Sequence, residues 1–120
     1  MSGAESRALG RWGEAQAADW LEKRGCVLVA ANWRCRFGEI DLIAEDGDFL
    51  CFVEVKLRRS SKFSTPREAV TPAKQHKLRQ TALMYLAETG LDCQPRFDVA
   101  EVYLGTNGIA QIEYYEDAFQ

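Results

Sequence analysis

The stretch 37–56 constrains the fold of this chain most, because two runs in it alternate with period two around Asp46-Gly47. An Asp-Gly pair flanked by alternating apolar residues is a strong signal for a β-hairpin. With Asp46 and Gly47 as the loop, Glu45 faces Asp48. Sliding a two-residue loop by one position changes the partners but keeps the two sets of residues that share a face.

The two faces of this hairpin differ in character. One is apolar throughout and is expected to join the core: Ile40, Leu42, Ala44, Phe49, Cys51, Val53 and Val55. The other is apolar near the turn, with Ile43, Leu50 and Phe52, and charged at the open end, with Glu39, Asp41, Glu54 and Lys56. We therefore expect another element to cover its apolar half and the charges to lie at the edge of that cover.

Three carboxylates share the open end of the hairpin. The pairing places Asp41 opposite Phe52 and Glu39 opposite Glu54, and such neighbours lie roughly 5 to 8 Å apart. Carboxylates this close repel one another unless a proton or a cation joins them. Mg²⁺ is commonly held by one or two carboxylates with water and phosphate. Lys56, on the same face, would polarise water or contact phosphate. The plainer alternative is a solvated sheet face with scattered charge.

Composition predicts one soluble globular domain over residues 1–120, with 47% hydrophobic and 28% charged residues. No apolar run reaches transmembrane length and no apolar signal-peptide core is visible, so we expect a cytoplasmic protein without membrane contact. The four cysteines form no C-x-x-C pair and there is one histidine. We expect reduced, mostly buried thiols and no zinc site.

Basic residues concentrate in the middle of a chain whose net charge is -3. Between residues 56 and 79 they outnumber acids eight to one. Such a stripe suits a phosphate-binding groove, or is simply a solvated surface. The candidate nucleic-acid contacts are Arg34, Arg36, Arg58, Arg59, Lys62, Lys74 and Lys77.

Periodicity and capping signals predict the other elements. A helix is expected over 5–24, a strand over 26–31 with a link to the hairpin, and a short helical turn from Thr65. Thr71-Pro72 then begins a longer helix over 73–88, which Gly90 ends. Strands are expected over 96–104 and 109–115. This order indicates an α/β sheet of about five strands with helices packed on it.

The charged residues also carry a resemblance. Asp41 followed by Glu54-Val55-Lys56 resembles the D…(D/E)-x-K signature of restriction-endonuclease-like nucleases. The longer strings G-E-I-D-L-I-A, F-V-E-V-K and R-F-D-V closely resemble the YraN family of uncharacterised bacterial proteins, which is similar to archaeal Holliday junction resolvases. The resemblance runs from Gly13 to Val99. It implies a restriction-endonuclease-like α/β fold, with a mixed sheet of about five strands flanked by helices.

This resemblance implies metal-dependent hydrolysis of DNA phosphodiesters, by an endonuclease that selects DNA structure. Asp41 and Glu54 would hold Mg²⁺, or Mn²⁺ in its place, with the Val55 carbonyl completing the shell. Lys56 would assist the attacking water. Glu39 and Glu14 would be secondary carboxylates, since related resolvases are similar in having a glutamate on the first helix that completes the site.

Two alternatives stay open. The first is a non-catalytic nucleic-acid-binding or partner-recruiting module, because a nuclease scaffold persists when catalysis is lost. The second is a hydrolase of another phosphate ester, although the basic stretch suits a polymeric anion such as DNA better than a small molecule. The sequence also leaves open whether the chain acts as a monomer or a homodimer.

Overall fold

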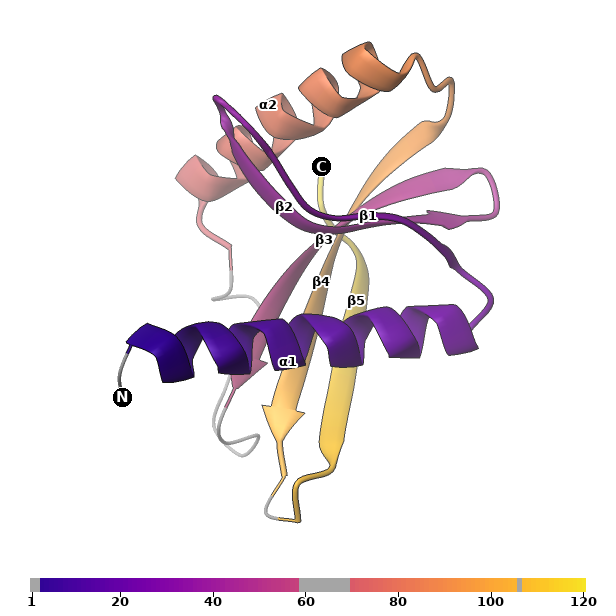
Figure 1. Cartoon of the computed structure of the whole chain (residues 1–120). Coiled ribbons are helices and arrows are strands. Elements are labelled where there is room, and N and C mark those ends of the chain that lie inside the picture. The colour runs from indigo at the N-terminus through magenta and orange to yellow at the C-terminus, as the bar shows by residue number, and fades with distance from the viewer. Residues whose placement is uncertain (1–2, 59–69, 106) are drawn as a thin grey trace.

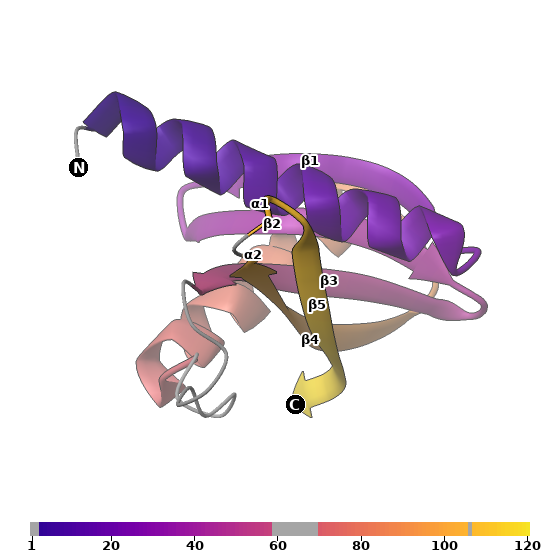
Figure 2. The same ribbon diagram turned by 90° about the horizontal axis from the view of Figure 1, so that it is seen from below.

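The computed structural model describes residues 3–58, 70–105 and 107–120, which form a five-stranded sheet with one helix on each face (Figures 1 and 2). The elements in order are α1 (Gly3–Lys23), β1 (Val27–Cys35), β2 (Gly38–Asp46), β3 (Phe49–Arg58), α2 (Pro72–Thr89), β4 (Gln94–Leu104) and β5 (Ala110–Phe119). The strands lie side by side in chain order. Only β3 and β4 run parallel, and the other neighbours are antiparallel. The mixed α/β sheet is therefore as the sequence predicts.

The helical turn expected from Thr65 lies outside the described residues. Within the described ranges, no helix is long and apolar enough to cross a membrane.

The β2–β3 hairpin forms where the Asp-Gly signal predicts it, but one register step later. Asp46 pairs with Phe49 and Ile43 with Phe52, so Gly47 and Asp48 form the loop. The expected pairs of Glu45 with Asp48 and of Asp41 with Phe52 are wrong. Gly47 has a φ of +60°, and glycine in the first loop position is the preference of type II′ turns. The shift moves each partner by two residues and leaves the faces unchanged, apart from Ile40.

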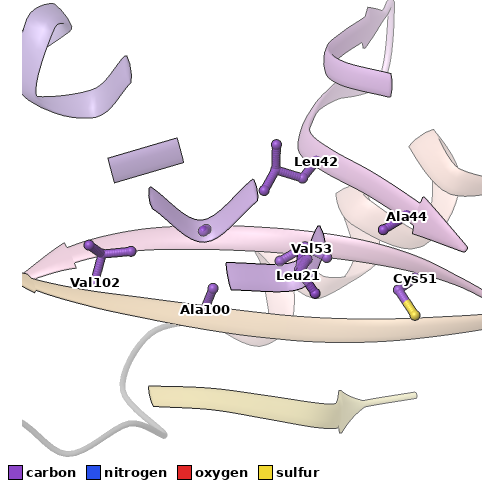
Figure 3. Close-up of a cluster of buried hydrophobic side chains, with 8 residues drawn as sticks. Leu21, Leu42, Ala44, Cys51, Val53, Ala100 and Val102 are labelled. Atoms are coloured by element: carbon purple, nitrogen blue, oxygen red, sulfur yellow. The ribbon is translucent and has the colours of Figure 1, made fainter. Parts of the chain in front are cut away.

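Helix α1 covers one face of the sheet. Its buried residues Ala17 and Leu21 meet apolar side chains of β2, β3 and β4, and Figure 3 shows Leu21 among them. We call this cluster the α1-side core; its buried members are Ala17, Leu21, Leu42, Ala44, Cys51, Val53, Ala100 and Val102. Burial of apolar surface contributes a free energy of roughly 25 cal/mol per Å², so the packing of this cluster is the main interaction that holds α1 on the sheet.

Helix α2 covers the other face, and with it the half-apolar side of the hairpin, as expected. We call this cluster the α2-side core; its buried members are Ile40, Ile43, Leu50, Phe52, Leu78, Ala82 and Tyr85. The helix begins at Thr71, whose side chain accepts a hydrogen bond from the backbone N–H of Lys74, and it ends at Gly90 with a φ of +67°. Both caps are those that the sequence predicts.

Two residues of the expected core face lie elsewhere. Ile40 packs in the α2-side core rather than beside Leu42, because the alternation breaks at Asp41 between them. Across from this point, Asn32 has a φ of +53° and lies within β1, which extends to Cys35 through the segment expected to be a link. Phe49 remains 40% exposed at the turn.

Candidate functional site

The candidate site lies where β2 and β3 separate. Their pairing runs from the turn to Leu42 and Val53, and Asp41 is the next residue. The backbone N–H of Val55 donates to Asp41 Oδ2 at 2.8 Å, so the side chain of Asp41 replaces the missing backbone contact. A cavity of about 310 Å³ opens there beside the first turns of α2. It is lined by Gly38, Glu39, Asp41, Glu54, Lys74, Lys77, Leu78 and Thr81.

Asp41 and Glu54 form a coupled pair of carboxyl groups. Burial, the hydrogen bond with Glu54 and the charge of Glu54 raise the pKa of Asp41 to about 8, against the opposing hydrogen bond from Val55. Burial also raises the pKa of Glu54, but its contacts with Asp41 and Lys74 outweigh burial and lower that pKa. The pair therefore holds a proton more tightly than an ordinary carboxyl group does, while Lys74 favours the charged form of Glu54.

Lys74 supplies the positive charge that Glu54 needs. Its Nζ lies 2.7 Å from Glu54 Oε2, and the side chain of Glu54 is only 8% exposed. Among the residues the structure describes, this ammonium is the partner that the buried Glu54 Oε2 has, because no hydrogen bond from another group reaches that oxygen. Burial lowers the pKa of Lys74, but the contact with Glu54 more than reverses this and raises it.

Lys56 follows Glu54 by two residues on the same strand and is half-buried beside the cavity. Burial and the positive charges of Lys74 and Arg58 lower the pKa of Lys56, against the attraction of Glu54 and Asp41. The structure therefore brings together three of the residues that the hairpin pattern singled out.

The two secondary carboxylates have different surroundings. Glu39 lines the cavity, and its Oε2 lies 2.8 Å from Arg34 Nε in an exposed ion pair between β2 and β1. Such a pair contributes little to stability. Glu14 lies half-buried on α1, and its charge is one of the causes that raise the pKa of Asp41. It is not among the residues that line the cavity.

The expected nucleic-acid contacts divide into four groups. Lys74 and Lys77 line the cavity. Arg34, with Glu39, and Arg58, whose Nε donates to the buried Glu101 at 3.2 Å, are held by carboxylates. The guanidinium of Arg36 lies over its neighbour Phe37, 4.8 Å from the ring centre. Arg59 and Lys62 lie outside the described residues.

Sequence reasoning missed the pairing of Lys74 with Glu54, and it missed Thr81 in the cavity wall. One signal did point to Lys74: a cation in the first turn of a helix opposes the helix dipole, so a nearby anion is expected. Thr81 is fully buried and its hydroxyl donates to the Lys77 carbonyl at 2.8 Å. A side chain on Gly38 would meet Thr81 Oγ1 at 3.2 Å, so this glycine lets α2 approach β2 closely.

The donors of this cavity fit a hard divalent cation. Two carboxyl groups lie in contact, and one of them presents a buried oxygen whose partner among the described residues is a cation, the Lys74 ammonium. Among the described residues, no group of three or more His, Cys, Asp and Glu side chains is close enough to hold a metal ion. Mg²⁺ does not require three, because it commonly keeps several waters and uses one or two carboxylates. The positive charge of Lys74 now lies where such a cation would be held.

Fold and site together define a class: an α/β protein with a mixed sheet, whose second and third strands separate at an acidic cavity lined by lysines. The chain belongs to the uncharacterised protein family UPF0102, whose family model matches residues 13–102. This confirms the resemblance to the YraN family.

Curated relatives of the same family match almost the whole chain. The UPF0102 protein of Symbiobacterium thermophilum is 49% identical over 95% of this chain and 98% of its own length. The UPF0102 protein of Rhodococcus opacus is 45% identical over 97% of this chain and 99% of its own length. The UPF0102 protein of Syntrophus aciditrophicus is 48% identical over 92% of this chain and 87% of its own length. None of these names states an activity, so function has to be argued from the site.

Proposed function

We propose that this chain is a metal-dependent endonuclease that hydrolyses phosphodiester bonds of DNA. The observation that carries the proposal is the contact between Asp41 and Glu54 at the separation of β2 and β3, with Lys56 beside them. The D…E-x-K spacing in the sequence supports the same conclusion. We include in this proposal that the fold is restriction-endonuclease-like and that the protein is cytoplasmic.

Each residue has a role that its surroundings support. Asp41 and Glu54 would hold Mg²⁺ or Mn²⁺, together with the Val55 carbonyl. When bound, that ion would neutralise charge on the phosphate and lower the pKa of water. Lys56 would orient the attacking water, because its side chain lies within reach of the charges of Glu54 and Asp41. Glu39 and Glu14 add negative charge near the pair, and Glu14 holds up the pKa of Asp41.

DNA would enter beside α2, where Lys77 and Lys74 line the cavity and face the phosphates. Arg36 would be a further phosphate contact, as would Arg34 and Arg58 if phosphate drew them from Glu39 and Glu101. Arg59 and Lys62 follow Arg58 in the chain. Neutralising phosphates releases counterions, so binding should weaken as salt rises. A homodimer would present two such sites to one DNA junction.

The test is cleavage of labelled single-stranded, duplex, flap and four-way DNA with Mg²⁺ or Mn²⁺. We expect at least one form to be cut, and Asp41→Asn to slow cleavage about a hundredfold or more because the amide lacks the charge a hard cation needs. Lys56→Ala should slow cleavage while metal binding persists. Asp48→Asn, an exposed change in the hairpin loop, is the matched control and should cut as the wild type does.

Failure of the wild-type protein to cut any DNA form in either metal would overturn the nuclease proposal. Salt-sensitive DNA binding without cleavage, unaffected by Asp41→Asn, would identify the chain as a nucleic-acid-binding module of the same fold. Equal losses in Asp41→Asn and Asp48→Asn would point to damage of the hairpin rather than of a site.

A further inference from the structure

Lys74 occupies a position that costs free energy on helix grounds alone. It lies in the first turn of α2, two residues after Pro72 and three after the cap Thr71. The start of a helix carries partial positive charge from backbone N–H groups without helical partners, and a cation there is unfavourable. The first turn of α2 contains no acidic residue to offset it. An attraction of comparable size must therefore come from outside the helix.

That attraction comes from Glu54 on β3. The ammonium lies 2.7 Å from Glu54 Oε2, and this carboxylate is 8% exposed whereas the lysine side chain is 45% exposed. The partners are thus unequal in exposure: the carboxylate is buried in the wall of the cavity, and the lysine reaches it from the solvent side. An ion pair of this kind can open by rotation of the lysine alone, without unfolding of the sheet.

The oxygen that Lys74 contacts is also the one a divalent cation needs. Glu54 Oε2 is buried, and among the described residues the Lys74 ammonium is the partner it has; both side chains line the cavity. An ammonium group and a metal ion compete for one buried oxygen, because their positive charges repel each other at this distance. Uptake of a divalent cation between Asp41 and Glu54 should therefore displace Lys74.

A displaced ammonium stays tethered beside the cavity and needs a new anion. Lys77, one turn further along α2, lines the same cavity, so both lysines would then face its entrance. Phosphate oxygens of a substrate are the anions that this entrance would admit. Lys74 can thus pair with the Glu54 carboxylate when no metal is bound and with a phosphate when metal and substrate are bound.

We infer that Lys74 is a tethered counter-ion which a divalent cation must displace from Glu54, and which then binds a substrate phosphate. This inference rests on the proposed function, because it assigns the regulation of that site. It links the two binding events: metal uptake frees the lysine for DNA, and DNA holds the lysine away from the carboxylate. By thermodynamic linkage each ligand then tightens the binding of the other.

The first experiment titrates Mn²⁺ into the full chain without DNA, followed by calorimetry. Lys74→Gln removes the competing charge, so we expect it to bind Mn²⁺ about tenfold more tightly than the wild type, which is a modest coupling. Lys77→Gln removes the same charge from the same cavity without touching Glu54, and is expected to change affinity less than twofold. Lys74→Arg keeps the ion pair and should stay near the wild type.

The second measurement needs no variant and so does not depend on the folding of Lys74→Gln. An amine-reactive reagent is applied to wild-type protein with and without Mn²⁺, and the labelling of each lysine is read by mass spectrometry. We expect Mn²⁺ to raise the labelling rate of Lys74 several-fold and to leave that of Lys77 unchanged. DNA added with Mn²⁺ should protect Lys74 again.

The outcomes separate the two proposals. Mn²⁺ binding that is equal in wild type and Lys74→Gln, with constant labelling of Lys74, would overturn the role of Lys74 and leave the metal site standing. Absence of Mn²⁺ binding in every protein, wild type included, would overturn the metal site and the inference together. Tighter binding in Lys77→Gln than in Lys74→Gln would also contradict the inference.

Discussion

Asp41 is the residue on which this site depends, because it serves both the backbone and the cavity. One of its oxygens accepts the Val55 N–H at the point where the β2–β3 ladder ends. Its carboxyl group also meets Glu54 in a buried setting, which raises its pKa to about 8. A carboxyl group that keeps its proton at neutral pH is stable there only in that protonated state, or when a cation replaces the proton.

A pH dependence of stability follows for the metal-free protein. The folded chain keeps the Asp41 proton up to about pH 8, whereas an unfolded chain releases it near pH ~4. Between these values the folded state binds more protons, so this residue lowers the free energy of unfolding as pH rises. Asp41→Asn removes the effect. With EDTA present, the free energy of unfolding of this variant, relative to that of the wild type, should therefore rise by on the order of 1 to 3 kcal/mol between pH ~4 and ~8.

Denaturant unfolding of both proteins across this range measures the difference. Asp48→Asn, in the exposed loop of the same hairpin, controls for general effects of losing an acid. A constant difference between Asp41→Asn and wild type at all pH values would mean that Asp41 is not protonated in the folded chain.

Strand β4 is the element that ties the sheet together on the side away from the cavity. Its fully buried Asp98 accepts hydrogen bonds from Arg96, from the Tyr114 hydroxyl at 2.6 Å and from the Asp117 N–H at 2.9 Å. Arg96 in turn reaches Asp46 at the hairpin turn and Glu116 on β5. The R-F-D-V string of the sequence is thus a structural anchor that joins β2, β4 and β5.

This anchor gives a stability prediction with a built-in control. Asp98→Asn should lower the free energy of unfolding by about 3 kcal/mol, because it leaves the nearly buried Arg96 without its main counter-charge. Glu116→Gln removes another carboxylate from the same arginine, but one whose side chain is 56% exposed, and should cost less than about 1 kcal/mol. Thermal or denaturant unfolding distinguishes them, and equal costs would contradict the role given to Asp98.

At the scale of the whole molecule, the sequence predicted the features that depend on local pattern better than the features that depend on long-range contacts. The period of two placed Asp41, Glu54 and Lys56 on one face, because alternation is enforced wherever both faces of a sheet are covered. It failed at Ile40, where the alternation breaks opposite Asn32, a residue of the neighbouring strand β1 in a left-handed conformation. The ion pair of Lys74 with Glu54 joins helix α2 to strand β3, which are distant in the sequence, and no local pattern encodes it.

The basic residues also show this difference between local pattern and long-range contact. The basic stripe of the sequence does reach the cavity through Lys74 and Lys77, but Arg58 is held by Glu101, whose side chain is fully buried. Composition counts charges without their partners, so it could not separate these two fates. The part of the stripe that remains for phosphate is therefore smaller than the sequence alone suggests.

The most direct test of the central claim is a crystal structure with Mn²⁺ and a short DNA duplex, in which anomalous scattering locates the metal. We predict a peak about 2 Å from carboxylate oxygens of both Asp41 and Glu54, with Lys74 Nζ moved from Glu54 to a phosphate. A saturated crystal without a peak in this cavity, and with Lys74 still against Glu54, would contradict the account.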